Sequence, residues 1–323
     1  MKNEKMIFGS VLLVAIFALA LLVPEAWAKY PDRKIRFIVP MAPGGGADLL
    51  ARALTRFVNP YLNDKVYVEN VTGGGAAIGF REGAKAAADG YTITMLVTTL
   101  TIAPHITKGY PTYDLYDPIC ILATDPMMIT VSIDSPYKTI ADLIAYAKAN
   151  PGKLTAGTSG VGGPSHLGIA AFGEAIGTQF TLVPHKGSAP VLVAAAGKHV
   201  DIGTSTCSEA IAMVEGKKLR PLAVFSPNRS RLFPDVPTTK EAGHEVYLDF
   251  WRGIGVPKGT PQEVKNVLVD AFRKSMENQE CKNFMDQQGL DRVYLEPKEA
   301  GPWLKNQHEF FKSTAMKLGI QPQ

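Results

Sequence analysis

Cysteine is scarce in this sequence, with three residues in a chain of 323. The count is odd, and Cys120, Cys207 and Cys281 are far apart, so none stands at the spacing of a metal site. An exported protein can join two cysteines in a disulfide, and the sequence leaves open which two, if any, are joined. We expect buried, structural thiols.

Motifs of common hydrolases are also absent. The chain holds no G-x-S-x-G and no H-E-x-x-H pattern, and its six histidines are scattered. Because catalytic groups can also assemble from distant positions, these absences do not exclude an enzyme. We expect no catalytic residue, no metal site and no cofactor.

An excess of charge is missing as well. The formal net charge is +4 at pH 7, and basic residues do not form a run. This pattern argues against nucleic acid as a partner. It is compatible with small anionic ligands but does not require them.

Long apolar runs are limited to the N-terminus. Residues 6–23 are apolar or small, Lys2 and Lys5 precede them, and Ala26-Trp27-Ala28 follows as an A-x-A cleavage site. A membrane anchor is the alternative, because about 18 apolar residues approach the length of a span. We expect a cleaved signal peptide over residues 1–28, export of the mature chain and no other membrane span.

A glycine-rich turn is the most informative feature that the sequence does contain. It follows an apolar run at residues 35–39, which indicates a buried strand, and precedes a helix predicted over residues 47–57. Gly44, Gly45 and Gly46 let the backbone turn sharply and approach a ligand closely. The first N–H groups of the helix have no intrahelical partner and can bind an anion. The turn is a candidate carboxylate or phosphate cradle, and the alternative is a simple connection between two elements.

Strand-like and helical segments alternate along most of the remaining chain. This order predicts an α/β fold with parallel sheets covered by helices. Beyond the first strand and helix, we expect strands at residues 65–70, 91–97, near 154, 180–183, 200–203 and 219–225, and helices at residues 76–88, 143–149, 164–176, 189–196, 209–215, 261–277 and 297–318.

Two longer extended runs suit crossovers between two lobes. They cover residues 119–133, with a break at Asp125-Pro126, and residues 246–256. We therefore expect one lobe from residues 29–124 and 253–323 and another from residues 125–252, with the last helix packed on either. Thr260 is the expected N-cap of the helix that follows the second crossover, with Pro261 in its first turn.

Two further glycine clusters follow predicted strands. The cluster at residues 73–79 lacks the G-x-G-x-x-G spacing, and no acidic residue ends the next strand, which disfavours a dinucleotide site. We expect it to pack closely at the edge of the cleft. The cluster at residues 158–166 repeats the chemistry of the first turn, with the Ser159 hydroxyl, exposed N–H groups and a helix beginning at Pro164. It is expected to face the first turn across a ligand, with His166 contacting either the ligand or, as we favour, nearby backbone.

Many short motifs follow one another in an order and spacing that cover nearly the whole chain after the leader. They are Tyr30-Pro31-Asp32-Arg33, Pro43-Gly44-Gly45, Val68-Glu69-Asn70, Gly73-Gly74-Gly75, Asp89-Gly90-Tyr91-Thr92, Ser159-Gly160-Val161-Gly162, Val183-Pro184-His185-Lys186-Gly187, Leu219-Arg220-Pro221-Leu222, Pro234-Asp235-Val236-Pro237-Thr238, Glu241-Ala242-Gly243 and Gly259-Thr260-Pro261. In these motifs the chain resembles the periplasmic solute-binding proteins of tripartite tricarboxylate transporters, the Bug family.

This resemblance implies a fold and a function. The fold is the two-lobed periplasmic-binding-protein type II fold, with a ligand cleft between the lobes. The function is capture of a small organic carboxylate and its delivery to the membrane permease subunits of a tripartite tricarboxylate transporter, by a protein that we expect to be a monomer. A ligand-binding sensory partner of a membrane receptor is the alternative that the sequence leaves open.

The resemblance also implies where the ligand binds. Backbone groups of the first turn hold its carboxylate, the second turn contributes from the other lobe, and two further loops flank the pocket. Met41 stands where the family often has an aromatic residue, and Ser205 stands where some members carry an acid, which weakens the case for an amino acid. The residues so implied are Met41, Gly44, Gly45, Gly46, Ala47 and Asp48 at the first turn, Ser159, Gly160, Gly162 and His166 at the second, and Thr98, Thr99, Ser205 and Thr206 at the flanking loops.

Neutral donors dominate this predicted site. No arginine lies within its turns, and Arg52, four residues after Asp48, is placed to pair with it. Aligned N–H groups and a helix terminus can hold a carboxylate without a formal counter-charge. We therefore expect a modest organic acid, and not a polyphosphate or an amino acid.

Overall fold

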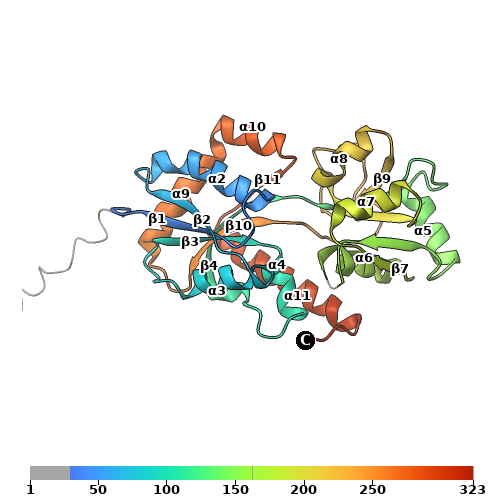
Figure 1. The fold of residues 1–323 in the computed structure, drawn as a ribbon, viewed down its shortest axis with the longest axis horizontal. Helices are drawn as coiled ribbons and strands as arrows, with labels where there is room; N and C mark the ends of the chain where they lie inside the picture. The colour runs from blue at the N-terminus through green and yellow to red at the C-terminus, as the bar shows by residue number, and fades with distance from the viewer. Residues whose placement is uncertain (1–29, 162, 323) are drawn as a thin grey trace, which may run out of the picture.

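The computed structural model describes residues 30–161 and 163–322, which form two bodies joined by extended segments (Figure 1). One body, here called the first lobe, is built on a six-stranded sheet of order β11-β4-β10-β3-β1-β2. The other, the second lobe, is built on a five-stranded sheet of order β7-β6-β8-β5-β9. The signal peptide predicted over residues 1–28 lies outside the described residues.

The sheet of the first lobe is mixed. Strand β1 runs parallel to β2 and β3, whereas β10 runs antiparallel to both β3 and β4, and β11 runs antiparallel to β4. The prediction of parallel sheets was therefore wrong for β10 and β11, which both run antiparallel to β4. The strands are β1 Ile35–Val39, β2 Val66–Asn70, β3 Thr92–Val97, β4 Tyr116–Thr124, β10 Arg252–Pro257 and β11 Asp291–Leu295.

Amphipathic helices cover this sheet. In α2 (Gly46–Val58), Leu50, Leu54 and Phe57 are spaced by four and three residues and are buried against the strands. Burying one such side chain stabilises the fold by about 1.5–3 kcal/mol. The other helices of this lobe are α3 Ala77–Lys85, α4 Thr99–Ile102, α9 Gln262–Glu277 and α10 Gln279–Gln287, with short 3-10 turns η2 Asn59–Tyr61, η3 Gly74–Ala76, η4 Ala103–His105 and η5 Tyr113–Leu115.

The sheet of the second lobe has its own hydrophobic core. Strand β6 runs parallel to β7 and β8, and β5 runs antiparallel to β8 and β9. Phe172 and Phe225 are fully buried in this core, with ring centroids 5.6 Å apart. The elements are β5 Met127–Ser132, α5 Ile140–Ala149, β6 Thr155–Thr158, α6 Pro164–Ala175, β7 Thr181–Pro184, α7 Ser188–Ala196, β8 Ile202–Thr206, α8 Cys207–Glu215 and β9 Leu219–Val224.

The chain passes between the lobes at two adjacent places. The first passage lies between β4 and β5, at Asp125 and Pro126, and the second lies just before β10. They are tied together by an isolated bridge between Pro126 and Asp249 and by a hydrogen bond from the Phe250 N–H to the Asp125 carbonyl, at 3.1 Å. The lobe boundaries at 124/125 and 252/253 stay predictions, although Arg252 already belongs to the first sheet as the first residue of β10.

The last helix, α11 (Pro297–Lys317), contacts both lobes. Its first half packs on the first lobe, where Trp303 meets Trp251 edge to face with ring centroids 5.5 Å apart. Its second half places Phe311 in the core of the second lobe, and Lys317 pairs with Glu174 of α6 at 2.6 Å. In Figure 1 this red helix runs beneath both bodies.

Several local predictions need correction. The N-cap of α9 is Pro261, because Thr260 instead donates its hydroxyl to the Pro257 carbonyl at 2.8 Å. The run at residues 246–256 is a strand only from Arg252 onward. The prediction also omitted α10 and β11, although Cys281 and Met285 of α10 stand on one buried face of that helix. All three cysteines are buried and free, as expected for structural thiols.

Candidate functional site

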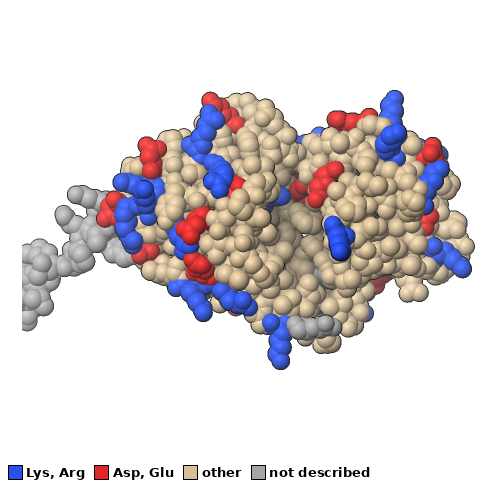
Figure 2. All heavy atoms as spheres, in the orientation of Figure 1, with Lys and Arg blue, Asp and Glu red and all other residues tan. Residues whose placement is uncertain are grey.

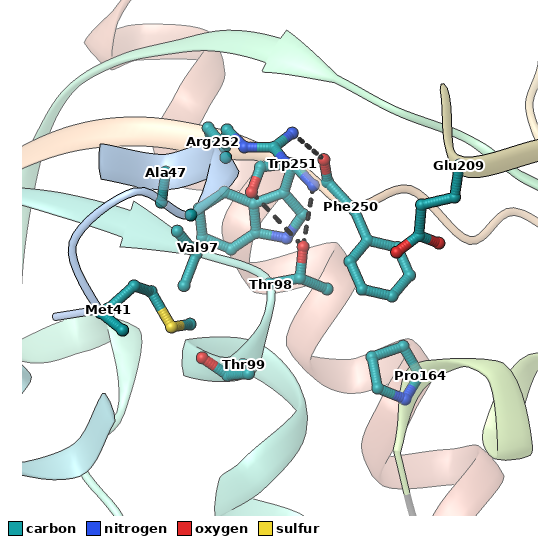
Figure 3. A pocket seen from close by; sticks show the side chains of 13 residues that line it. Met41, Ala47, Val97, Thr98, Thr99, Pro164, Glu209, Phe250, Trp251 and Arg252 are labelled. Carbon is teal, nitrogen blue, oxygen red and sulfur yellow. Dashed lines mark hydrogen bonds between the residues drawn. The ribbon is translucent and has the colours of Figure 1, made fainter. Parts of the chain in front are cut away.

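A cavity of about 460 Å³ lies between the lobes, where the surface view shows a hollow (Figure 2). This volume is typical of sites for small molecules. The first lobe lines it with the turn after β1, the end of β3 and the start of β10, and the second lobe with the starts of α6 and α8 (Figure 3). The lining residues are Met41, Ala42, Gly45, Gly46, Ala47, Val97, Thr98, Thr99, Pro164, Glu209, Phe250, Trp251 and Arg252.

The first glycine turn, residues 41–47, presents a helix N-terminus to the cavity. Gly45 is the N-cap of α2 and has no side chain to cap it, so the N–H groups of Gly46 and Ala47 have no intrahelical acceptor. All three residues line the cavity. Glycine is required for conformation at Gly44, whose φ is +79°, whereas Gly45 has an extended backbone that other residues adopt. Oriented N–H groups and the helix dipole make this turn a favourable place for an anion.

Asp48 stabilises the first turn through hydrogen bonds on the side away from the cavity lining. Its buried carboxylate accepts hydrogen bonds from the Gly44 N–H at 2.8 Å, from Arg52 Nε at 3.0 Å and from Asn70 Nδ2 at 2.9 Å. Asn70 also donates to the Met41 carbonyl at 3.0 Å. Burial alone would raise the pKa of Asp48, but the hydrogen bonds from Arg52, Gly44 and Asn70 outweigh it, and the pKa lies below its usual range. The pairing of Arg52 with Asp48 that the sequence indicated is confirmed.

Arg252 brings a positive charge to the same turn. An added Cβ on Gly46 would lie 3.4 Å from Arg252 Nη2, so the guanidinium is next to the uncapped helix terminus. Its Nη1 donates to the Phe250 carbonyl at 3.3 Å. Burial lowers the pKa of Arg252, while Asp125 and Glu209 oppose that effect, and an arginine remains charged in proteins. A charged donor from outside the predicted turns therefore lines the cavity beside the neutral donors that the sequence indicated.

Apolar residues and residues of the second crossover form the rest of the first-lobe lining. The Thr98 hydroxyl is engaged by the second crossover, because it accepts from the Trp251 N–H at 2.8 Å and lies 3.2 Å from the Asp249 carbonyl. Trp251 is almost fully buried against α11. Figure 3 shows Met41, Val97 and Phe250 around this part of the cavity. Thr98 therefore connects the cavity lining to the second passage between the lobes through hydrogen bonds.

The second lobe adds two residues, Pro164 and Glu209. Pro164 is the first residue of α6, where its missing N–H is not needed. Glu209 is part of a capping box at the start of α8: its Oε2 accepts from the Thr206 N–H at 3.1 Å, and its own N–H donates to the Thr206 hydroxyl at 3.4 Å. A carboxylate thus faces the cavity from the lobe opposite Arg252 (Figure 3).

Buried acids lie where the lobes are joined. Asp125 accepts hydrogen bonds from the N–H and hydroxyl of Ser208. Burial raises its pKa, and Ser208 and Arg252 partly offset this. Burial, followed by the negative charges of Asp291 and Asp125, raises the pKa of Asp249 to about 7. The crossover therefore concentrates acidic groups close to Arg252.

The residues predicted for the site fall into two groups. Met41, Gly45, Gly46, Ala47, Thr98 and Thr99 line the cavity, whereas Gly44, Asp48, Ser159, Gly160, His166, Ser205 and Thr206 do not. Gly162 lies outside the described residues. Since the structure holds no ligand, the predicted contacts stay predictions.

Several predicted residues of the second lobe make hydrogen bonds within that lobe. Ser165 accepts from the Ser159 N–H at 2.8 Å and lies 2.8 Å from the Ser159 hydroxyl. His166 Nδ1 lies 3.5 Å from the Thr158 hydroxyl, and burial lowers the pKa of His166. Ser205 is buried and donates to the Thr206 carbonyl at 3.1 Å.

The sequence analysis also missed residues that line the cavity, chiefly Arg252, Glu209 and Phe250. A signal for Glu209 was present, since Thr206 and Glu209 stand in the T-x-x-E spacing of a capping box. Arg252 and Phe250 flank Trp251 in an extended run, whose sequence does not say which side chains face the ligand. In the remaining cluster, Gly79 packs closely as expected, because an added Cβ would lie 2.4 Å from the Val71 carbonyl.

Residues 30–161 and 163–322 contain no group of three or more His, Cys, Asp or Glu side chains placed to hold a metal ion. Over the same residues, no helix has both the length and the apolar character needed to cross a membrane.

Comparison with known proteins places the chain in a family. A model of the tripartite tricarboxylate transporter family receptors, TctC, matches residues 50–319. A UPF0065 protein of Bordetella pertussis is 32% identical over 314 residues, which are 96% of this chain and 97% of that protein.

Solved structures agree with this match. A TctC solute-binding protein from Polaromonas, solved without ligand, is 34% identical with a TM-score of 0.84, over 90% of this chain and 100% of that one. A protein from R. palustris solved with adipate is 26% identical with a TM-score of 0.73, over 91% of this chain and 100% of that one. These matches confirm the predicted two-lobed α/β fold of periplasmic binding proteins. The chain belongs to the tripartite tricarboxylate transporter receptor family, a family of substrate-binding receptors.

Proposed function

We propose that this protein captures a small organic carboxylate in the cleft between its lobes and delivers it to the permease subunits of a tripartite tricarboxylate transporter. The observation that carries the proposal is the uncapped N-terminus of α2, which lines the cavity with Arg252 beside it. N–H groups, a helix dipole and a guanidinium converge there, and each favours a carboxylate.

The form of the cavity supports a small ligand. Its volume of about 460 Å³ suits a molecule of modest size. Arg252 is the lining residue that carries a positive charge, which favours a ligand with few negative charges over a polyphosphate. The related R. palustris protein that was solved with adipate supports a carboxylate as the ligand class.

A thermal-shift screen over mono-, di- and tricarboxylates and aromatic acids tests the ligand class. A ligand that binds only the folded state raises the melting temperature. For an acid found in this way, replacing its carboxylate by the amide should weaken binding by about 1.5–3 kcal/mol, the contribution of hydrogen bonds to a charged group. An amide that binds as tightly as the acid would contradict the proposed carboxylate site.

The same preparation tests the absence of catalysis that we propose. The acid should be recovered chemically unchanged after incubation with the protein, by mass spectrometry of the released ligand. A new product formed in proportion to the protein concentration would favour an enzyme.

Delivery to a permease is tested by uptake. We propose that the protein works in the periplasm as a monomer after removal of residues 1–28, as the family and the leader suggest. Deleting the gene should abolish uptake of the identified acid, and the wild-type gene should restore it. Normal uptake together with a lost transcriptional response to the acid would favour a sensory role. Light scattering of the purified mature protein checks the predicted monomer.

A further inference from the structure

Side chains of opposite charge face the same cavity from different lobes. Arg252 begins β10 in the first lobe, and Glu209 lies in the first turn of α8 in the second. Their hydrogen bonds in the described part of the chain go to backbone groups: Arg252 donates to the Phe250 carbonyl, and Glu209 accepts from the Thr206 N–H. The two charges therefore approach the cavity without neutralising each other in a direct pair.

We propose that Glu209 selects the far end of the bound acid. The ligand carries its carboxylate at the first turn and Arg252, and a hydrogen-bond donor, a hydroxyl or an ammonium group, at its other end. A second carboxylate at that end is disfavoured. This inference rests on the proposed function and adds the chemical class of the ligand.

The geometry of Glu209 leaves it able to bind a donor. The capping box uses Oε2, so the other oxygen has no hydrogen-bond partner among the described residues. An ionised carboxylate only accepts hydrogen bonds, and it therefore pairs with a hydroxyl or an ammonium group. A dicarboxylate would bring a second negative charge to the same place, and the like charge of Glu209 would repel it.

The sequence disfavoured a ligand with an ammonium group because Ser205 stands where some family members carry an acid. That side chain is buried and donates to the Thr206 carbonyl, and it does not line the cavity. The charge that faces the ligand from the second lobe belongs instead to Glu209. An amino or hydroxy acid is thus compatible with the cavity.

The competing explanation is that Glu209 only caps α8. A carboxylate at this position of a helix is favourable in itself. The variant Glu209→Gln separates the two roles, because glutamine also completes a capping box but carries no charge. Asp142→Asn is the matched control: Asp142 occupies the same position in the capping box of α5, in the same lobe, and is not part of the cavity lining.

The experiment is calorimetric titration at about pH 8, where both ends of a diacid are ionised. The probes are 6-hydroxyhexanoate, 6-aminohexanoate, hexanoate and adipate, with the corresponding four-carbon acids as a second set. We expect wild type and Asp142→Asn to bind the donor-ended acids on the order of tenfold tighter than the diacid of equal length. Glu209→Gln should lose most of this preference, chiefly through tighter binding of the diacid. Thermal melting confirms that each variant is folded.

Three results would overturn the inference. If wild type binds adipate and succinate as tightly as the donor-ended acids, or if Glu209→Gln leaves the ratio unchanged, Glu209 is a helix cap only, while the proposed function stands. If wild type binds none of the acids in either set, this inference fails, and the wider screen with tricarboxylates and aromatic acids decides whether the carboxylate site of the proposed function fails as well.

Discussion

The two glycine turns of this protein follow a strand, precede a helix and differ in what their polar groups do. In the first, the Asp48 carboxylate accepts a hydrogen bond from the Gly44 N–H, while the N–H groups of Gly46 and Ala47 have no intrahelical acceptor and both residues line the cavity. In the second, residues 158–163, Ser165 binds both the N–H and the hydroxyl of Ser159.

The difference teaches that glycine content alone does not identify a ligand site. Both turns end in an N-cap glycine of similar backbone conformation, Gly45 with φ −77° and Gly163 with φ −70°. What separates them is the next polar side chain along the helix. Asp48 accepts from the N–H of Gly44, which precedes the N-cap, and leaves the first N–H groups of α2 without an intrahelical partner. Ser165 instead binds the N–H and the hydroxyl of Ser159 within its own turn.

Substitutions of the two N-cap glycines should give the largest difference in ligand affinity between the turns. Gly45→Val should weaken binding of the identified acid by on the order of 100-fold or more, which is roughly 2.7 kcal/mol. Because the Gly45 backbone is extended, valine is expected to fit the chain and to block the cavity with its side chain. Gly163→Val, away from the lining, should bind normally. Calorimetry on both folded variants decides, and normal affinity in Gly45→Val would remove the first turn from the site.

Arg252 provides a further difference between the two turns, because its guanidinium lies beside the first turn. Arg252→Met should weaken acid binding by about 1.5–3 kcal/mol and should narrow the difference between an acid and its amide. Arg56→Met is the control. Arg56 lies on α2, the helix that follows the first turn, but its side chain pairs with Glu280 on the surface. Equal losses in the two variants would mean that Arg252 makes no contact with the carboxylate.

Asp48 should make the stability of the first turn depend on pH. Its pKa is depressed in the folded state, so its stabilising contribution is present above the unfolded pKa of about 4 and is lost as the pH falls through the folded pKa. Asp48→Asn should lower the free energy of unfolding by about 1–2 kcal/mol at pH 7, and wild type and variant should converge in acid.

The second turn provides the control for this pH dependence. Ser165→Ala removes its neutral hydrogen bonds and should cost about 1 kcal/mol at either pH. Urea denaturation at neutral and acidic pH measures both variants. A penalty in Asp48→Asn that persists in acid would show that its charge does not hold the turn.

Ser159 should give the smallest effect. Its hydroxyl is engaged by Ser165 and lies outside the cavity lining, so Ser159→Ala should change the affinity for the acid by less than about twofold, below roughly 0.4 kcal/mol. A tenfold loss in calorimetry would restore the sequence-based hypothesis, in which both turns bind one ligand.

Local sequence was enough for most of the fold. Strand β1 was predicted with its observed bounds, and α6 begins at Pro164 as predicted, because apolar runs and a proline at the first helical position act over short distances. The break at Asp125-Pro126 separates two observed strands. The first turn was also recognised from its neighbours in the chain, and Gly45, Gly46 and Ala47 do line the cavity.

Only the tertiary structure decided which charges face the cavity. Arg252 and Glu209 lie on different lobes, and the crossover and the start of α8 bring both to the cavity. The same holds for α11, whose pattern allowed either lobe and whose Trp303 and Phe311 pack on different ones. Periodicity and capping depend on residues within a few positions of one another, so the sequence by itself determined most of the elements and the first turn. A site between lobes depends on contacts between distant segments, which local patterns do not encode.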